Sequence, residues 1–170
     1  MTTLRLSTIS LMLCIILWGT LLGGIAYSHI VYFPVYLSAL PDSAVIVNGP
    51  FGLNEAVFWL TIHPLLILSL IITLVLNWRL KSRRKLIFIS FGVYAVILVI
   101  SQIYFIPELG AFAHSPQSTL SPAEWLARGQ RWQRLSWLRG TIAYIFIVPL
   151  LLALTKPADR HVKTEATKAL

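Results

Sequence analysis

The residues of this chain that could do chemistry are a few polar and ionisable side chains set among long apolar stretches. His29 and His63 lie inside two such stretches, and Arg139 lies just before another. A neutral histidine can move protons near pH 7, and an arginine can hold an anionic or carbonyl oxygen. Because ionisable groups are costly inside a membrane, each of them is expected to turn inward and to find a partner.

These groups are expected to collect at one depth of a helix bundle. At the rise of an α-helix, His29 lies about 12 Å and His63 about 10 Å from the predicted outer ends of their helices. Gln102 falls near the same level in the third apolar stretch. Three prolines near this layer free backbone carbonyls: Pro34, Pro64 and Pro107. The sequence therefore predicts a polar pocket in the outer third of the bundle.

The predicted roles follow from the chemistry of the side chains. His29 or His63 would move protons, while Arg139 and Glu108 would orient a substrate, so these four are the predicted catalytic residues. Arg139 and Glu108 are expected to form an ion pair, with Glu55 as the alternative partner of the arginine. Four further side chains are expected to line the site: Tyr27, Gln102, Tyr104 and Trp132.

Structural interpretations are open for the same residues. A lone histidine in a membrane helix is commonly a hydrogen-bonded packing element, and an Arg139–Glu108 pair is compatible with a tie between helices. Gly19, Gly23 and Gly24 are expected to let helices approach closely. The sequence has no H-x-x-x-H or E-x-x-H spacing, so no metal site is predicted, and nothing in it identifies a redox cofactor.

Composition indicates what surrounds this layer. Of the 170 residues, 57% are hydrophobic and 12% are charged, whereas ordinary soluble domains carry about 25% charged residues. So few charges could not cover a soluble surface, and lipid is the expected solvent. Four apolar stretches are long enough to cross a hydrocarbon core of about 30 Å, and they predict helices at about 11–37, 56–77, 86–107 and 135–154.

The expected fold is therefore an all-α integral membrane protein, a four-helix transmembrane bundle that forms a single domain over residues 1–170. An amphipathic helix is expected in the third loop, over 122–137. Ser121 is its predicted N-cap, Pro122 its first residue and Glu124 its N3 residue. The arginines of this segment either meet lipid phosphates or face the mouth of the pocket. No internal repeat or low-complexity tract stands out, and a pairwise similarity between helices is left open.

Charge indicates orientation and partners. The net charge of +8 would suit nucleic acid, but the basic residues cluster beside apolar stretches, in the loop at 79–85 and in the tail at 156–170. Cytoplasmic anchors that face anionic lipid have this placement, so nucleic-acid binding is not predicted. Both termini are expected to be cytoplasmic, in a bacterial inner (plasma) membrane. The expected partners are the lipid bilayer and a hydrophobic small molecule, and a homo-oligomer or a membrane partner protein is left open.

Three stretches of the chain resemble a family of small four-helix membrane proteins that includes the anthrone oxygenases. They are the segment 23–28 followed by Pro34, the segment 102–109, and Trp125 followed by 131–134 and Arg139. They are similar to the family's glycine-rich first helix ending in proline, its aromatic and proline stretch closing helix three, and its tryptophan and arginine signature before helix four. The resemblance spans most of the chain and implies an oxygenase-type protein that acts on a hydrophobic aromatic or quinone-like molecule entering from lipid.

Two hypotheses of function follow. In the first, the protein is an enzyme whose polar pocket binds or oxidises such a molecule. In the second, it is a non-catalytic membrane subunit or a lipid-binding protein, and the polar layer only locks the helices together. A small transporter is less favoured, because four helices enclose little space.

Overall fold

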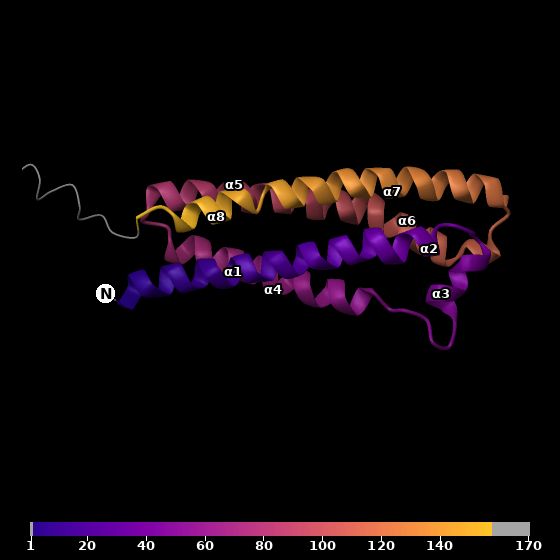
Figure 1. Cartoon of the computed structure of the whole chain (residues 1–170), viewed down its shortest axis with the longest axis horizontal. Coiled ribbons are helices and arrows are strands. Elements are labelled where there is room, and N and C mark those ends of the chain that lie inside the picture. The colour runs from indigo at the N-terminus through magenta and orange to yellow at the C-terminus, as the bar shows by residue number, and fades with distance from the viewer. Residues whose placement is uncertain (1, 158–170) are drawn as a thin grey trace, which may run out of the picture.

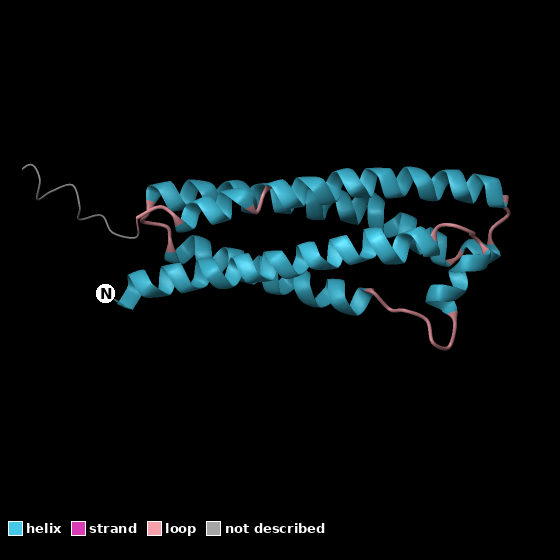
Figure 2. Cartoon of the chain, in the orientation of Figure 1, coloured by secondary structure: helices cyan, strands magenta, loops and turns pink. Residues whose placement is uncertain are grey.

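The computed structural model describes residues 2–157, and these form helices joined by short turns (Figure 1, Figure 2). The first half of the chain contains a long first helix that bends through short helical pieces, and a second long helix: α1 (Thr2–Tyr27), a π-helical turn (Ser28–Tyr32), α2 (Phe33–Tyr36), a 3₁₀ turn (Asp42–Ala44), α3 (Val45–Asn48) and α4 (Ala56–Leu76). The second half follows the same plan: α5 (Lys81–Ile100), a π-helical turn (Ser101–Phe105), α6 (Ile106–Ala113), a 3₁₀ turn (Ser115–Gln117), α7 (Pro122–Ile145) and α8 (Val148–Leu154).

Four of the helical stretches are long and apolar enough to cross a membrane. They are Arg5–Tyr36, Ala56–Leu76, Lys81–Ala113 and Pro122–Leu154. The predicted all-helical fold with four such helices is therefore confirmed for the described part of the chain. The second stretch agrees with the predicted 56–77, whereas the others are longer than predicted.

The first and third helices continue past Pro34 and Pro107 because a π-helical turn precedes each proline. The N–H of Phe33 donates to the carbonyl of Ser28, and the N–H of Ile106 donates to the carbonyl of Ser101. These wider i→i+5 bonds shift the backbone register before the proline, which cannot donate. The two turns also begin alike, with Ser-His-Ile at 28–30 and Ser-Gln-Ile at 101–103. A short similarity between helices one and three is therefore present.

The predicted amphipathic segment 122–137 is helical, but it is not a separate helix. It forms the first half of α7, which runs from Pro122 to Ile145 without a break and corrects the predicted fourth-helix start near 135. The predicted start is confirmed as a capping box: Ser121 Oγ accepts from the N–H of Glu124 at 3.4 Å, and the N–H of Ser121 donates to Glu124 Oε2 at 2.8 Å. As a result, Arg139 lies near the middle of the fourth apolar stretch.

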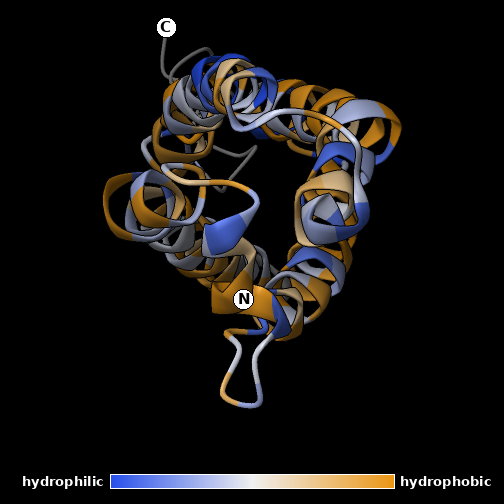
Figure 3. Ribbon diagram, turned by 90° about the vertical axis from the view of Figure 1, so that its right-hand side faces the viewer, coloured by the Kyte–Doolittle hydropathy of each residue, from blue (hydrophilic) through white to orange (hydrophobic). Residues whose placement is uncertain are grey.

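The helices pack mainly in two pairs, α1 with α4 and α5 with α8 (Figure 1). Viewed down the long axis, the helices surround a common centre (Figure 3). Buried side chains form two clusters. The basal cluster lies among the spanning helices and includes Trp18, Leu66, Tyr94 and Leu150. The distal cluster is aromatic and includes Tyr36, Phe112, Trp125 and Trp132.

Close helix contacts occur at glycines that only partly match the predicted ones. A Cβ at Gly24 would collide with the ring of Phe58, which confirms the expected close approach there. Gly19 and Gly23 have no atom within 4 Å of such a Cβ, so the prediction is wrong for these two. In α7, a Cβ at Gly140 would lie 3.0 Å from Cγ2 of Ile25 in α1. Gly140 therefore sets the distance between α1 and α7 beside Arg139.

Gly140→Ala is expected to be less stable than the matched variant Gly19→Ala by about 1–3 kcal/mol, the usual cost of overpacking. Both changes gain about 1 kcal/mol of helix propensity, but only the methyl group at 140 meets a neighbouring helix. Unfolding of both variants in the same detergent, followed by circular dichroism, measures the difference. Equal stability would show that α1 and α7 are not in close contact at this position.

Candidate functional site

His29 lies in the first π-helical turn and forms hydrogen bonds through both ring nitrogens. Nδ1 is 2.8 Å from the carbonyl oxygen of Ile25, and Nε2 is 3.0 Å from Oγ of Ser136 in α7. A carbonyl oxygen only accepts, so Nδ1 must carry the proton, and Nε2 of the neutral ring accepts from the serine hydroxyl. The ring also packs against Trp137, with 4.7 Å between centroids. His29 is therefore held as a neutral acceptor whose basic nitrogen faces α7.

Arg139 is the centre of the polar layer. Its Nη2 donates to Oγ of Ser136 at 3.0 Å, and its Nη1 donates to Oγ of Ser101 at 2.8 Å. The guanidinium carbon lies 3.9 Å from the ring centroid of Phe105, a cation–π contact. Ser136 therefore accepts from the arginine while it donates to His29, so the three groups form one polarised chain between the first π-helical turn and α7.

The predicted ion pair of Arg139 with Glu108 is wrong. Glu108 instead accepts two hydrogen bonds from Arg128, from Nε to Oε2 at 2.6 Å and from Nη2 to Oε1 at 2.8 Å. This bidentate pair joins α6 to α7 nearer the distal cluster, and it is the only ion pair among residues 2–157. Within the same residues, no carboxylate pairs with Arg139, the alternative partner Glu55 included.

Glu55 lies directly before α4 and binds the first π-helical turn. Oγ of Ser28 donates to its Oε1 at 2.8 Å, and Nε1 of Trp59 donates to its Oε2 at 3.5 Å. Burial raises the pKa of the Glu55 carboxyl, and these two donors offset part of that rise. The equivalent serines of the two π-helical turns thus hold opposite charges, since Ser28 binds Glu55 and Ser101 binds Arg139.

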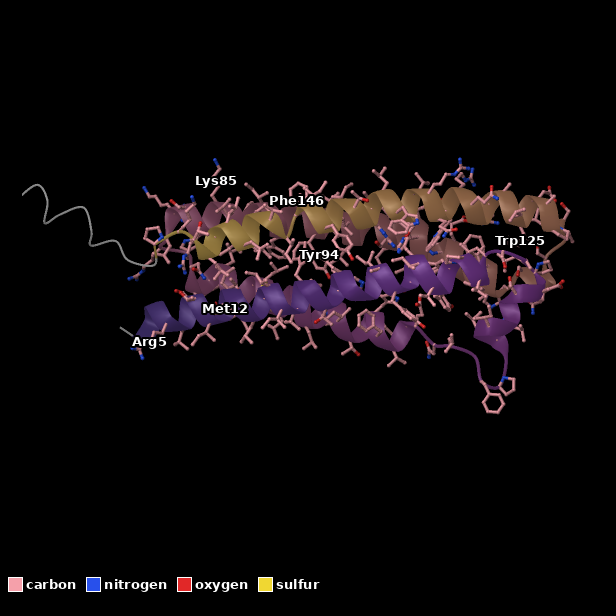
Figure 4. The ribbon with its side chains drawn as sticks, in the orientation of Figure 1. Arg5, Met12, Lys85, Tyr94, Trp125 and Phe146 are labelled. Carbon is pink, nitrogen blue, oxygen red and sulfur yellow. The ribbon has the colours of Figure 1, made fainter. Side chains whose placement is uncertain are left out.

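His63 belongs to a different local arrangement. Its Nδ1 lies 2.6 Å from the hydroxyl of Tyr94, and its ring stacks on Trp59 with 5.7 Å between centroids. Tyr94 is fully buried and contacts Trp18, and Figure 4 shows it pointing in between the two helix pairs. No described hydrogen bond joins His63 to His29. The two predicted proton carriers therefore have separate partners.

An open groove lies between α5 and α7, beside Arg139. Its volume is about 390 Å³, and its walls are almost wholly apolar. Residues that line it include Gly92, Val96, Ile100, Leu135, Leu138 and Ile142. Val96 and Leu138 are more than half exposed, so the groove opens sideways from the bundle. Arg139 and Tyr104 are the two lining residues that carry polar groups.

The four predicted lining residues are placed differently from one another. Tyr104 lines the groove, and its hydroxyl is buried without a hydrogen-bond partner among the described residues. Trp132 is fully buried behind Phe105, donating to its carbonyl oxygen at 3.2 Å, so it packs rather than lines. Tyr27 is 57% exposed and Gln102 is also exposed, and neither lines the groove.

Sequence reasoning missed the residues that hold the network together. Ser136 lies three residues before Arg139, and that spacing places the two on one helical face. Ser101 begins a π-helical turn, and the proline that follows this turn is its one signal in the sequence. Within residues 2–157, no group of three or more His, Cys, Asp and Glu could hold a metal ion.

Ser136→Ala is expected to lower the free energy of unfolding by about 1–2 kcal/mol, because it leaves Nε2 of His29 and Nη2 of Arg139 without partners. Thr141→Ala is the control, since Thr141 lies on the exposed side of α7 and donates only to the carbonyl of Trp137. Thr141→Ala should change the free energy of unfolding by no more than about 0.5 kcal/mol. Chemical unfolding of both variants in micelles tests this, and similar losses would mean that Ser136 ties nothing together.

Glu55→Gln is expected to change the pH dependence of stability. Because the pKa of Glu55 is raised on folding, the folded state binds more protons, and its stability falls as pH rises through the titration of this carboxyl. Glu55→Gln has no carboxyl to titrate at this position. The melting temperature of the variant, relative to that of the native chain, should therefore rise as pH is raised from about 4 to about 7. A gain that is larger at acid pH would contradict the burial of this carboxyl.

Comparisons of the chain with models of protein families, with curated proteins and with solved structures gave no match. The resemblance to the family that includes the anthrone oxygenases therefore stays a prediction from the three sequence stretches. The groove, the charge of Arg139 and the serine–histidine network are the observations from which a function can be argued.

Proposed function

We propose that this protein binds a lipid-soluble aromatic or quinone-like molecule in the groove between α5 and α7, with an oxygen of the ligand held by Arg139. The observation that carries the proposal is an arginine beside an apolar, sideways-open groove, with no carboxylate partner among the described residues. An unneutralised guanidinium at this level favours an anionic or strongly accepting ligand oxygen.

The groove suits a flat hydrophobic ligand of small size. A volume of about 390 Å³ falls within the range of small-molecule sites, and Phe105 and Tyr104 supply aromatic surface for stacking. Arg139 has five N–H donors, and its described hydrogen bonds to Ser101 and Ser136 use two of them. Because the groove walls are almost wholly apolar, a ligand oxygen would reach the other donors after a shift of the arginine side chain. The hydroxyl of Tyr104 has no hydrogen-bond partner among the described residues, but it is buried, so a ligand would reach it only after the tyrosine side chain moved.

The resemblance to anthrone oxygenases suggests the reaction. Oxidation of anthrone by one O₂ gives anthraquinone and one water, and it requires removal of protons from the ring carbon between the two aromatic rings. Arg139 would stabilise the enolate oxygen that forms when the first proton leaves. Nε2 of neutral His29 would receive a proton by a relay in which Ser136 Oγ takes up the substrate proton and passes its own proton to the histidine. Ser136 is fully buried and does not line the groove, so this relay requires a movement that opens the serine to the ligand. No cofactor is assigned.

A structural role is the second candidate, and one observation favours it. Most polar groups of the layer bind one another: Ser28 binds Glu55, and Ser136 binds both His29 and Arg139. Such a network could lock α1, α4 and α7 together while the groove holds only lipid chains. In this case the protein would be a non-catalytic membrane subunit or a lipid-binding protein.

Binding of 2-hydroxy-1,4-naphthoquinone, an anionic bicyclic quinone, is expected to depend on Arg139. Arg139→Gln should weaken it about 10- to 100-fold, the worth of a charged hydrogen bond. Arg134→Gln is the matched control, because Arg134 is exposed on the same helix and donates only to the carbonyl of Gln130. Quenching of tryptophan fluorescence in detergent gives the affinities, and 2-methylnaphthalene, which has no oxygen, should be insensitive to both changes.

The outcomes separate the two candidates. Equal affinity of Arg139→Gln and the native chain, together with a large loss of stability, would favour the structural role. For the reaction, anthrone is incubated with the native chain and O₂, and anthraquinone is measured by mass spectrometry. Product that is lost in His29→Gln, with quinone binding retained, would support catalysis. Binding without product would leave a binding protein and remove the oxygenase activity.

A further inference from the structure

A second groove lies at the turn between α4 and α5, at the opposite end of α5 from the π-helical turn. Its volume is about 560 Å³, and it is open on one side. It is lined by Trp78, Lys81, Arg84, Lys85, Phe88 and Ile89. The three basic residues lie at the start of α5, and the two apolar residues follow one turn further into the apolar stretch that begins at Lys81.

One basic side chain of this groove, that of Arg84, is held in place by Trp78. The guanidinium carbon of Arg84 lies 5.0 Å from the ring centroid of Trp78, and its Nη1 donates to the carbonyl of Trp78 at 3.2 Å. These contacts fix the arginine against the turn and use one of its five donors. The remaining N–H groups are therefore preorganised beside Lys81 and Lys85.

The positive charges of this groove are not balanced by the described part of the chain. Lys81 and Lys85 are four residues apart on one helix, where like charges repel. The start of α5 is also the positive end of its dipole, its first turn has no acidic residue, and Leu80 supplies no side-chain cap. The four acidic residues within 2–157 all belong to the loops and helices at or beyond the level of the polar layer: Asp42, Glu55, Glu108 and Glu124. An anion from outside the chain would relieve this repulsion.

The apolar residues of the groove define the kind of anion. Phe88 is 60% exposed and Ile89 is 38% exposed, directly beside the basic residues. Figure 4 shows Lys85 at the same end of the molecule as Arg5 and far from Trp125. Inorganic phosphate or a nucleic acid would neutralise the charges but leave Phe88 and Ile89 uncovered. An amphiphile with an anionic head and a hydrocarbon chain matches both parts.

We propose that this groove binds one anionic phospholipid, with its phosphodiester between Lys81, Arg84 and Lys85 and an acyl chain along Phe88 and Ile89. The site is separate from the groove beside Arg139 and does not depend on the proposed quinone binding. Each basic residue near such a head group contributes about fivefold to affinity.

The test uses the full chain in nanodiscs that contain equal amounts of phosphatidylglycerol and phosphatidylcholine, released in native mass spectrometry. The native chain should retain phosphatidylglycerol in preference to phosphatidylcholine. The double variant Lys81→Gln/Lys85→Gln should lose this preference by about fivefold for each charge removed. Arg5→Gln, which removes an exposed charge outside the groove, should keep it. An equal loss in Arg5→Gln, or no preference in the native chain, would overturn the proposal.

Two further measurements guard against misfolding and against a simple anion site. In lipid-free detergent, the double variant should melt at or above the temperature of the native chain, because repulsion is relieved, whereas phosphatidylglycerol should stabilise only the native chain. A double variant that is less stable without lipid would contradict the electrostatic argument. Phe88→Ala should reduce retention of phosphatidylglycerol. If it does not, and glycerol phosphate displaces the lipid, the site binds a free anion and the lipid proposal fails.

Discussion

The structure depends on how one guanidinium is accommodated in the middle of an apolar helix. An arginine at the centre of a membrane costs about 2.5–3.5 kcal/mol on insertion scales, and no described carboxylate neutralises Arg139. The chain offsets part of this cost with two serine hydroxyls and the face of Phe105. Because these partners come from α7 itself and from the turn after α5, the position of Arg139 fixes how the two helices meet. The groove beside Arg139 lies where α5 and α7 come together in this way.

The two π-helical turns explain why the required polar groups occur at one level. Each turn precedes a proline and begins with a serine, and the extra residue in each turn rotates the following side chains relative to a regular helix. Ser28 and His29 begin the first turn and bind Glu55 and Ser136, and Ser101 begins the second turn and binds Arg139. The first serine of each π-helical turn therefore binds a charged residue of another helical segment, an acidic one in the first turn and a basic one in the second.

Part of this arrangement could be predicted from the sequence. Apolar length was enough for four spanning helices, and the residues Ser121 to Glu124 were enough for a capped helix start, because both signals are local. The partner of Glu108 was not predictable in the same way. Choosing Arg128 over Arg139 requires knowing that α7 begins at Pro122 and continues unbroken, which places Arg128 beside α6. The roles of Ser101 and Ser136 likewise depend on helix rotation, which hydrophobic periodicity leaves loosely defined when a helix is apolar on all sides.

The two grooves together bear on how ligands would reach the protein. The groove at the turn between α4 and α5 and the groove beside Arg139 follow neighbouring faces of α5. This follows from the spacing of their lining residues Lys85, Ile89 and Val96, which lie four and seven residues apart. Both grooves are lined in part by exposed apolar side chains, Val96 and Leu138 in one and Phe88 in the other. A ligand dissolved in lipid could therefore reach either groove by lateral diffusion, without crossing water. In a bilayer, four helices would be sufficient for this kind of access, because lipid would fill the open side of each groove.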